Sequence, residues 1–210
     1  MPMDEWKIDG LVAGSQKALM LPTGLSFVAF SKKAESFFDK ATCSRFYFDI
    51  RREKKANASG ETFFSSSVTL VRALDVVLNL IEKQGLNQLF HSIHRRAEVT
   101  RIFAPKLGFS LYAKAPSDSV TALTVPSHMD GQKIRLYLEE KFKITIMGGQ
   151  DQAKGKIIRI GHMGYIQDAE MLRLLGCLGL TLQHFDAKFL SDAQIQTAVD
   201  EMKTWLASHP

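Results

Sequence analysis

Lys17 is the residue whose side chain and setting best fit covalent chemistry. It lies in GLVAGSQKALMLPTGLSFVAFS, between the small pair Gly14-Ser15 and an apolar run at 25–30. An ammonium group is costly to place in apolar surroundings, where a lysine more readily becomes a neutral nucleophile towards carbonyl groups. The stretch therefore indicates Schiff-base chemistry at Lys17, with a solvated loop lysine as the alternative.

Arg159 is a candidate anion-binding residue. It lies in IIRIGHMG, between Ile158 and Ile160. A planar guanidinium can donate two parallel hydrogen bonds to a carboxylate. In an apolar strand such an arginine needs an acidic partner, which is either a side chain of the protein or a ligand. On the residues alone, a structural ion pair is the better interpretation.

Other residues with possible chemistry indicate structural roles. His91 and His94 have helical spacing, but no third ligand accompanies them, so no metal site is predicted. Cys43 and Cys177 lie far apart in no metal-type spacing, as expected for reduced, buried thiols of a cytoplasmic protein.

The composition is that of a soluble globular protein. The chain has 210 residues, 45% hydrophobic and 23% charged, with a net charge of +5. Its densest basic cluster, within 51–55, is short and lacks interleaved aromatic residues, so nucleic-acid binding is not predicted. We find no signal peptide and no apolar run of about 18 residues, and therefore expect no membrane association and a cytoplasmic location.

The elements around Lys17 form the first of two expected domains, residues 1–84. The apolar run at 25–30 is typical of a strand that is buried on both faces. A strongly amphipathic helix ends near Gly85, the expected boundary. The expected order is strand 7–13, strand 25–30, helix 32–41, strand or edge piece 45–50, polar loop 54–67 and a helix around 70–81.

Residues 85–210 have the pattern of a compact α+β domain that contains Arg159. Ser191 and Gln194 fit a capping box at the start of the last helix. The expected order is helix 87–106, strands 109–115 and 119–126, helix 130–142, strands 143–149 and 154–164, and helices 167–183 and 191–208.

Four segments resemble class V aminotransferases, especially the serine–pyruvate/alanine–glyoxylate group. The first, GSQKALMLPTGLSFVAFS, resembles the family's cofactor-lysine segment. The others are GETFFSSSVTLVRALDVVL, QGLNQLFHSIHRRAEVTR and KITIMGGQDQAKGKIIRIGHMG. The resemblance implies an α/β fold: part of the large domain of the fold type I pyridoxal-phosphate transferases, then an α+β small C-terminal domain.

The resemblance also implies roles for single residues. Lys17 would form the Schiff base with pyridoxal 5'-phosphate and move a proton during transamination. Gln16 and Ser15 would contact or flank the cofactor phosphate. Related cysteine desulfurases have His in place of Gln16, which favours transamination over desulfuration here.

Two further roles follow from the same resemblance. Thr62, where some members have Tyr, and Ser65 would reach across a dimer interface to the partner's cofactor phosphate, with helix capping as the alternative. Arg159 would bind the α-carboxylate of the substrate.

The resemblance implies transamination between a small amino acid, alanine or serine, and a 2-oxo acid, glyoxylate or pyruvate. Family chains are nearly twice as long, so we expect this chain to lack the aspartate on the cofactor's ring nitrogen, the stacked aromatic ring and the phosphate-binding turn. It would act as a homodimer or with an N-terminal half. The alternatives are a non-catalytic fragment or assembly partner, and a lyase.

Overall fold

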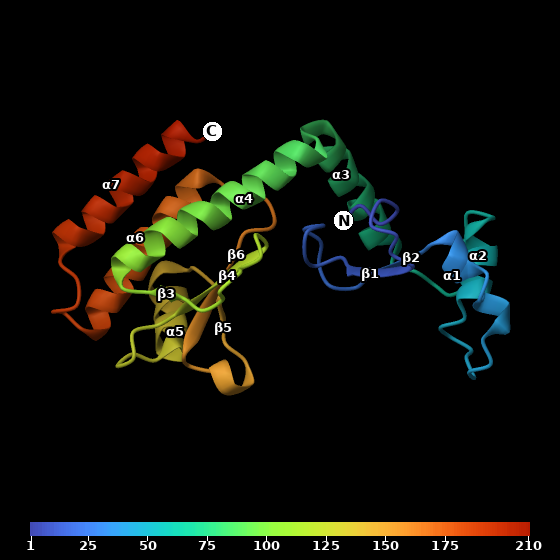
Figure 1. The fold of residues 1–210 in the computed structure, drawn as a ribbon, viewed down its shortest axis with the longest axis horizontal. Coiled ribbons are helices and arrows are strands. Elements are labelled where there is room, and N and C mark those ends of the chain that lie inside the picture. Colours follow the sequence, from blue (N-terminus) through green and yellow to red (C-terminus); the bar gives the residue numbers. More distant parts are fainter. The chain divides into compact units, whose positions relative to one another are not determined.

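The computed structural model describes all 210 residues and divides the chain into two compact units, Met1–Lys83 (unit 1) and Gln84–Pro210 (unit 2) (Figure 1). None of the helices combines the length and apolar character that a membrane span requires.

Unit 1 begins with an antiparallel hairpin. Strands β1 (Gly10–Gly14) and β2 (Ser26–Phe30) pair along their whole length, from Gly10 opposite Phe30 to Gly14 opposite Ser26. Both strands were expected, but burial of the second on both faces is wrong: Val28 is 49% exposed and Phe30 38%. The hairpin is the only sheet of unit 1, so within this unit no second layer covers it.

Short helices follow the hairpin. Helix α1 covers only Lys32–Glu35, and a 3₁₀ turn at Phe38–Lys40 completes the expected helical segment. The strand expected at 45–50 is wrong, because Asp49 instead caps helix α2 (Ile50–Asn57) by accepting a hydrogen bond from the Arg51 N–H. The helix also occupies the first residues of the expected polar loop. Burial of both cysteines was expected, but Cys43, before this helix, is exposed and only Cys177 is buried.

Helix α3 (Val68–Gln84) ends unit 1. Its apolar periodicity predicted the helix but not its burial, since Val77 is its only buried residue. Leu70 packs against the hairpin loop, where a Cβ on Gly24 would lie 2.6 Å from Leu70 Cδ1. The remaining apolar positions of α3 are half-buried or exposed.

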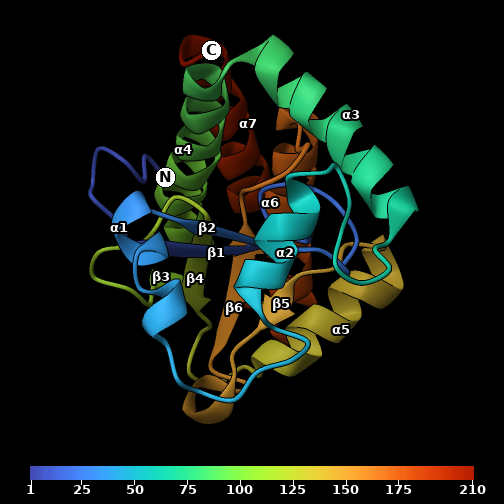
Figure 2. The same cartoon turned by 90° about the vertical axis from the view of Figure 1, so that its right-hand side faces the viewer.

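Unit 2 is a four-stranded antiparallel sheet with helices packed on one face (Figure 1). The strand order is β3-β4-β6-β5, and helices α4, α6 and α7 pack on one another. Helix α5 lies at the β5 end of the sheet (Figure 2). The bounds are α4 Leu86–Phe103, β3 Ser110–Leu111, β4 Val120–Thr124, α5 Gly131–Phe142, β5 Met147–Gly148, β6 Ile157–Gly161, α6 Asp168–Phe185 and α7 Asp192–Ser208.

The core of unit 2 lies between the sheet and these helices. Ile158 and Ile160 of β6 are buried in it, as are Leu123 of β4 and Leu178 of α6. Every element expected after residue 85 is present, although all four strands are shorter than predicted. The capping box of Ser191 and Gln194 is confirmed.

Candidate active site

Lys17 lies in the turn that follows β1. Its carbonyl accepts a hydrogen bond from the Met20 N–H at 3.0 Å, and Met20 adopts a left-handed conformation with φ 55°. Lys33 and Lys54 of the same unit form ion pairs, whereas Lys17 is exposed and has none. The partly buried setting expected for Lys17 is therefore wrong within unit 1, because the neighbouring apolar strand is itself uncovered.

Ser15 and Gln16, the two residues before Lys17, differ in whether their polar side-chain groups are free to bind a ligand. Ser15 is fully buried, and its hydroxyl donates to the Pro22 carbonyl at 2.7 Å and accepts from the Leu25 N–H at 3.2 Å. A phosphate contact through this hydroxyl was predicted, but the loop already occupies it, so of the two predicted roles only flanking the phosphate fits the geometry. Gln16 is exposed, and its amide makes no hydrogen bond within the chain.

Gly14 leaves the space that the Gln16 side chain uses. A Cβ at Gly14 would lie 2.8 Å from Gln16 Oε1, which is closer than atoms of this kind approach. The Gln16 amide therefore lies beside the backbone at the end of β1, one residue from Lys17. The residue before the candidate lysine therefore carries an uncommitted amide.

Thr62 and Ser65 lie in the exposed loop that leads to α3. The Thr62 hydroxyl donates to the Phe64 carbonyl at 2.6 Å, and the helix begins only at Val68. Neither residue therefore caps the helix, which was the alternative interpretation. Ser65 is exposed and its hydroxyl makes no hydrogen bond within the chain.

Arg159 lies in the middle of β6, opposite Met147 of β5 and Ala122 of β4. Its Nε donates to the Gly148 carbonyl at 2.8 Å. No carboxylate pairs with it, although Arg95 and Arg101 of the same unit both form ion pairs. A structural ion pair, the interpretation favoured by the residues alone, is wrong: the two terminal nitrogens of this half-buried guanidinium are free.

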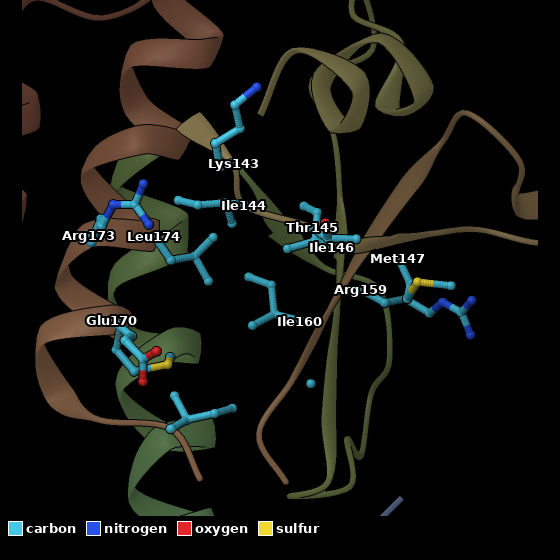
Figure 3. A pocket seen from close by; sticks show the side chains of 13 residues that line it. Lys143, Ile144, Thr145, Ile146, Met147, Arg159, Ile160, Glu170, Arg173 and Leu174 are labelled. Carbon is cyan, nitrogen blue, oxygen red and sulfur yellow. The ribbon is translucent and has the colours of Figure 1, made fainter. Parts of the chain in front are cut away.

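Arg159 borders a cavity of about 330 Å³ between β6, the segment before β5 and α6. Figure 3 shows Ile144, Ile160 and Leu174 side by side, whereas Arg159 extends along Met147. The other charged groups at the cavity are tied to the backbone. Glu170 accepts from the Gln167 N–H, Arg173 donates to the Phe142 carbonyl and Lys143 donates to the Glu140 carbonyl.

Arg96 of α4 holds the segment that follows β6 through hydrogen bonds. Its buried guanidinium donates to the carbonyls of His162 and Ile166, both at 2.9 Å. His162 is fully buried against the Thr121 hydroxyl at 2.8 Å, and burial lowers its pKa to about 4, with nearby Arg101 contributing. His162 is therefore a neutral packing residue at physiological pH.

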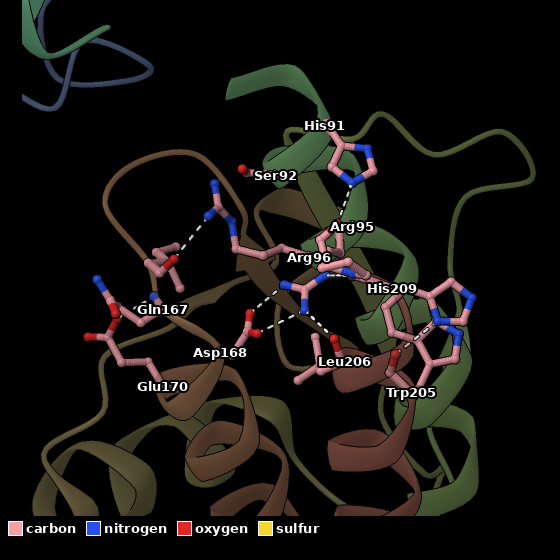
Figure 4. A network of polar contacts seen from close by, with 12 residues as sticks. His91, Ser92, Arg95, Arg96, Gln167, Asp168, Glu170, Trp205, Leu206 and His209 are labelled. Atoms are coloured by element: carbon pink, nitrogen blue, oxygen red, sulfur yellow. Dashed lines mark hydrogen bonds and ion pairs between the residues drawn. The ribbon is translucent and has the colours of Figure 1, made fainter. Parts of the chain in front are cut away.

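Arg95, in the middle of α4, binds the start of α6 and the end of α7 (Figure 4). It donates to both carboxylate oxygens of Asp168 at 2.6 and 2.8 Å, and also to the carbonyls of Leu206 and His209. Sequence reasoning missed Arg95 and Arg96. The signal available was the pair of adjacent arginines inside a helix, but their partners lie more than 60 residues away.

The candidate residues thus fall on three segments: 15–17 and 62–65 in unit 1, and β6 in unit 2. Residues 1–174 match the family described as "Aminotransferase class-V". The chain belongs to the class-V aminotransferases. This confirms the family that the sequence predicted.

Two relatives illustrate the match. The chain is 36% identical over 184 residues to "Soluble hydrogenase, small subunit" of Synechococcus sp. (strain PCC 6716), covering 87% of this chain and 48% of the relative. It is 34% identical over 183 residues to the serine–glyoxylate aminotransferase of Methylorubrum extorquens, covering 83% and 45%. The chain therefore spans about half the length of the curated relatives it matches.

Solved structures support the fold. The ureidoglycine–glyoxylate aminotransferase of Bacillus subtilis superimposes with a TM-score of 0.86 at 25% identity, over 94% of this chain and 53% of that one. The pyridoxamine–pyruvate aminotransferase of Mesorhizobium loti gives 0.84 at 24% identity, over 96% and 53%. The predicted fold class, a partial α/β fold of the fold type I aminotransferases, is confirmed.

Proposed function

We propose that this chain is the lysine- and arginine-bearing part of a pyridoxal-phosphate-dependent aminotransferase that transfers an amino group between alanine or serine and glyoxylate or pyruvate. Relatives named serine–glyoxylate and L-aspartate–glyoxylate aminotransferases support amino acids and a small 2-oxo acid as substrates. Residues 1–84 are assigned to the C-terminal part of the large cofactor-binding domain, and 85–210 to the small domain. The cellular location is proposed to be cytoplasmic.

The observation that carries this proposal is the state of Arg159. Its Nε is held by the Gly148 carbonyl, so the direction of the guanidinium is set, while its terminal nitrogens have no acidic partner. A half-buried cation without a counter-ion is unfavourable unless a ligand supplies one. The α-carboxylate of an amino acid has the geometry to accept two hydrogen bonds from it.

The residues around Lys17 fit the cofactor. The Lys17 side chain is exposed, and the amide of the preceding Gln16 is exposed and makes no hydrogen bond within the chain. Lys17 would hold the cofactor through Nζ and carry the proton at the substrate Cα, while Gln16 would donate to the phosphate and Ser15 would flank it. When bound, the cofactor supplies the electron sink for that proton transfer.

Thr62 and Ser65 complete the proposed site. Both lie on an exposed loop, and the Ser65 hydroxyl is free to donate to a phosphate. We propose that they act on the cofactor of a second subunit, as part of a homodimer or of an assembly with an N-terminal half.

The test combines binding and exchange. The full chain, with pyridoxal phosphate, is titrated with serine and with glyoxylate, and the cofactor spectrum is followed. We expect Lys17→Ala to abolish the lysine-dependent absorbance band. Arg159→Lys should weaken the amino acid response about tenfold or more, because loss of the bidentate contact costs at least about 1.4 kcal/mol.

A second candidate is a non-catalytic assembly partner. The observation that favours it is the exposure of apolar residues in unit 1, namely Val12, Val28, Phe46, Tyr47 and Phe48. In the experiment above, this candidate gives no band that Lys17→Ala removes, together with oligomers by light scattering. A Lys17-dependent band that responds to serine contradicts the assembly-partner hypothesis. Formation of an elimination product from serine would instead identify a lyase, the remaining alternative.

A further inference from the structure

The loop that carries Lys17 is tied together by Ser15. Its N–H donates to the Leu25 carbonyl at 3.1 Å, and its carbonyl accepts from the Leu21 N–H at 3.1 Å. Its hydroxyl donates to the Pro22 carbonyl and accepts from the Leu25 N–H. Every hydrogen-bonding group of this fully buried residue is therefore used inside the loop that joins β1 to β2.

These bonds confine the backbone of Lys17. The bond from Leu21 to Ser15 closes a loop around residues 16–20, and inside it the Met20 N–H donates to the Lys17 carbonyl. Packing adds little, because Leu21 is the only buried apolar residue of the loop. The position from which the Lys17 side chain projects therefore depends mainly on hydrogen bonds that meet at Ser15.

We infer that Ser15 is a positioning residue that holds the turn of Lys17 in the geometry that the cofactor needs. This inference rests on the proposed role of Lys17. A reactive group that is held in place reacts faster than one that samples many positions. Removing the hydroxyl leaves the Leu25 N–H without its partner in a partly buried site, which favours opening of the loop.

Ser15 and Gln16 then have different roles, although they are neighbours in the sequence. A direct phosphate contact by the Ser15 hydroxyl would require it to give up the hydrogen bond that it donates to the Pro22 carbonyl. Gln16, whose amide is uncommitted, can make such a contact at no cost of this kind. Ser15 acts through Lys17, whereas Gln16 acts on the cofactor.

The experiment measures covalent labelling of Lys17 rather than activity. The full chain is incubated with pyridoxal phosphate, trapped with borohydride and mapped by peptide mass spectrometry, well below the melting temperature of each variant. Exposed Lys32 serves as the internal reference. We expect preferential labelling of Lys17 in the wild type, and about fivefold less in Ser15→Ala at unchanged Lys32 labelling.

Ser26→Ala is the matched control. Ser26 is exposed on β2, and its side chain makes no hydrogen bond within the chain, so both lysines should keep their wild-type labelling. Wild-type selectivity for Lys17 that persists in Ser15→Ala overturns the role of Ser15 alone. Absence of selectivity in the wild type overturns the proposed role of Lys17, and the inference with it.

If Ser15→Ala does not fold, hydrogen exchange of the wild-type amides tests whether the bonds of Ser15 hold the loop. Amides of Leu21 and Leu25 that exchange as slowly as those paired between β1 and β2, together with selective labelling of Lys17, support the inference. Exchange of the Leu25 amide at the rate of an unstructured peptide overturns it, because the hydroxyl then does not hold the loop.

Discussion

Unit 2 buries a continuous apolar core, whereas unit 1 is held together mainly by hydrogen bonds and surface contacts. All members of the core cluster belong to unit 2. Unit 1 contributes only Leu21 and Val77 to the buried apolar residues. The same kinds of apolar pattern occur in both units, so the difference lies in what covers them.

This difference bears on how each unit positions its candidate residue. Arg159 projects from the central part of a sheet whose other face carries the apolar core of unit 2, and its Nε donates to the Gly148 carbonyl. Lys17 projects from a turn whose order comes from the bonds of Ser15. We therefore expect substitutions of apolar residues to act strongly in unit 2 and weakly in unit 1.

A pair of identical substitutions tests this expectation most directly. Leu182→Ala removes a fully buried side chain from α6 and should lower the free energy of unfolding by about 4 kcal/mol. Leu78→Ala removes a side chain of α3 that is 48% exposed and should cost less than about 1 kcal/mol. Urea unfolding of the two variants measures both values, and equal losses would contradict the comparison.

His162 gives unit 2 a pH dependence in mildly acidic solution. Burial holds its pKa at about 4, against 6.5 for an ordinary histidine, so the unfolded chain takes up a proton first as the pH falls. Stability is therefore complete above pH 6.5 and is lost between about pH 6.5 and 4, by up to about 3 kcal/mol.

The control for this prediction is His162→Gln, which can still bond to the Thr121 hydroxyl but does not titrate. Thermal unfolding followed from pH 7 to pH 4 should show a flatter profile for the variant than for the wild type. Identical slopes would mean that His162 is accessible to protons in the folded protein.

Local sequence signals predicted elements well, but not their surroundings. The capping box of Ser191 and Gln194 depends on residues three positions apart, and it was found correctly. The periodicity of α3 shows which face of the helix is apolar, yet nothing in it states what covers that face. Burial of the strand at 25–30 was predicted wrongly for the same reason.

The sequence indicated candidate residues, but not their hydrogen-bond partners. Lys17 and Arg159 were selected by residue type and neighbouring residues, and their roles remain predictions. That the Arg159 guanidinium lacks a carboxylate, and that Gly148 holds it, depends on cross-strand pairing that no short motif encodes. Ser15 was predicted to contact or flank the phosphate. Its bonds to Pro22 and Leu25 could not be predicted, because they form only when the loop closes.

The smallest expected difference concerns ion pairs in the two units. Arg95 is largely buried and bonds to both oxygens of Asp168, so Arg95→Met should cost about 2 kcal/mol. Lys33 pairs with Asp9 on the surface of unit 1, where its side chain is 74% exposed, and Lys33→Met should cost less than about 0.5 kcal/mol. Urea unfolding in low and in high salt checks both: salt should reduce the small effect of Lys33→Met and leave most of the effect of Arg95→Met, because solvent screens only the exposed pair. A large, salt-insensitive effect of Lys33→Met would contradict the comparison, because it would show that the Lys33–Asp9 pair is shielded from solvent.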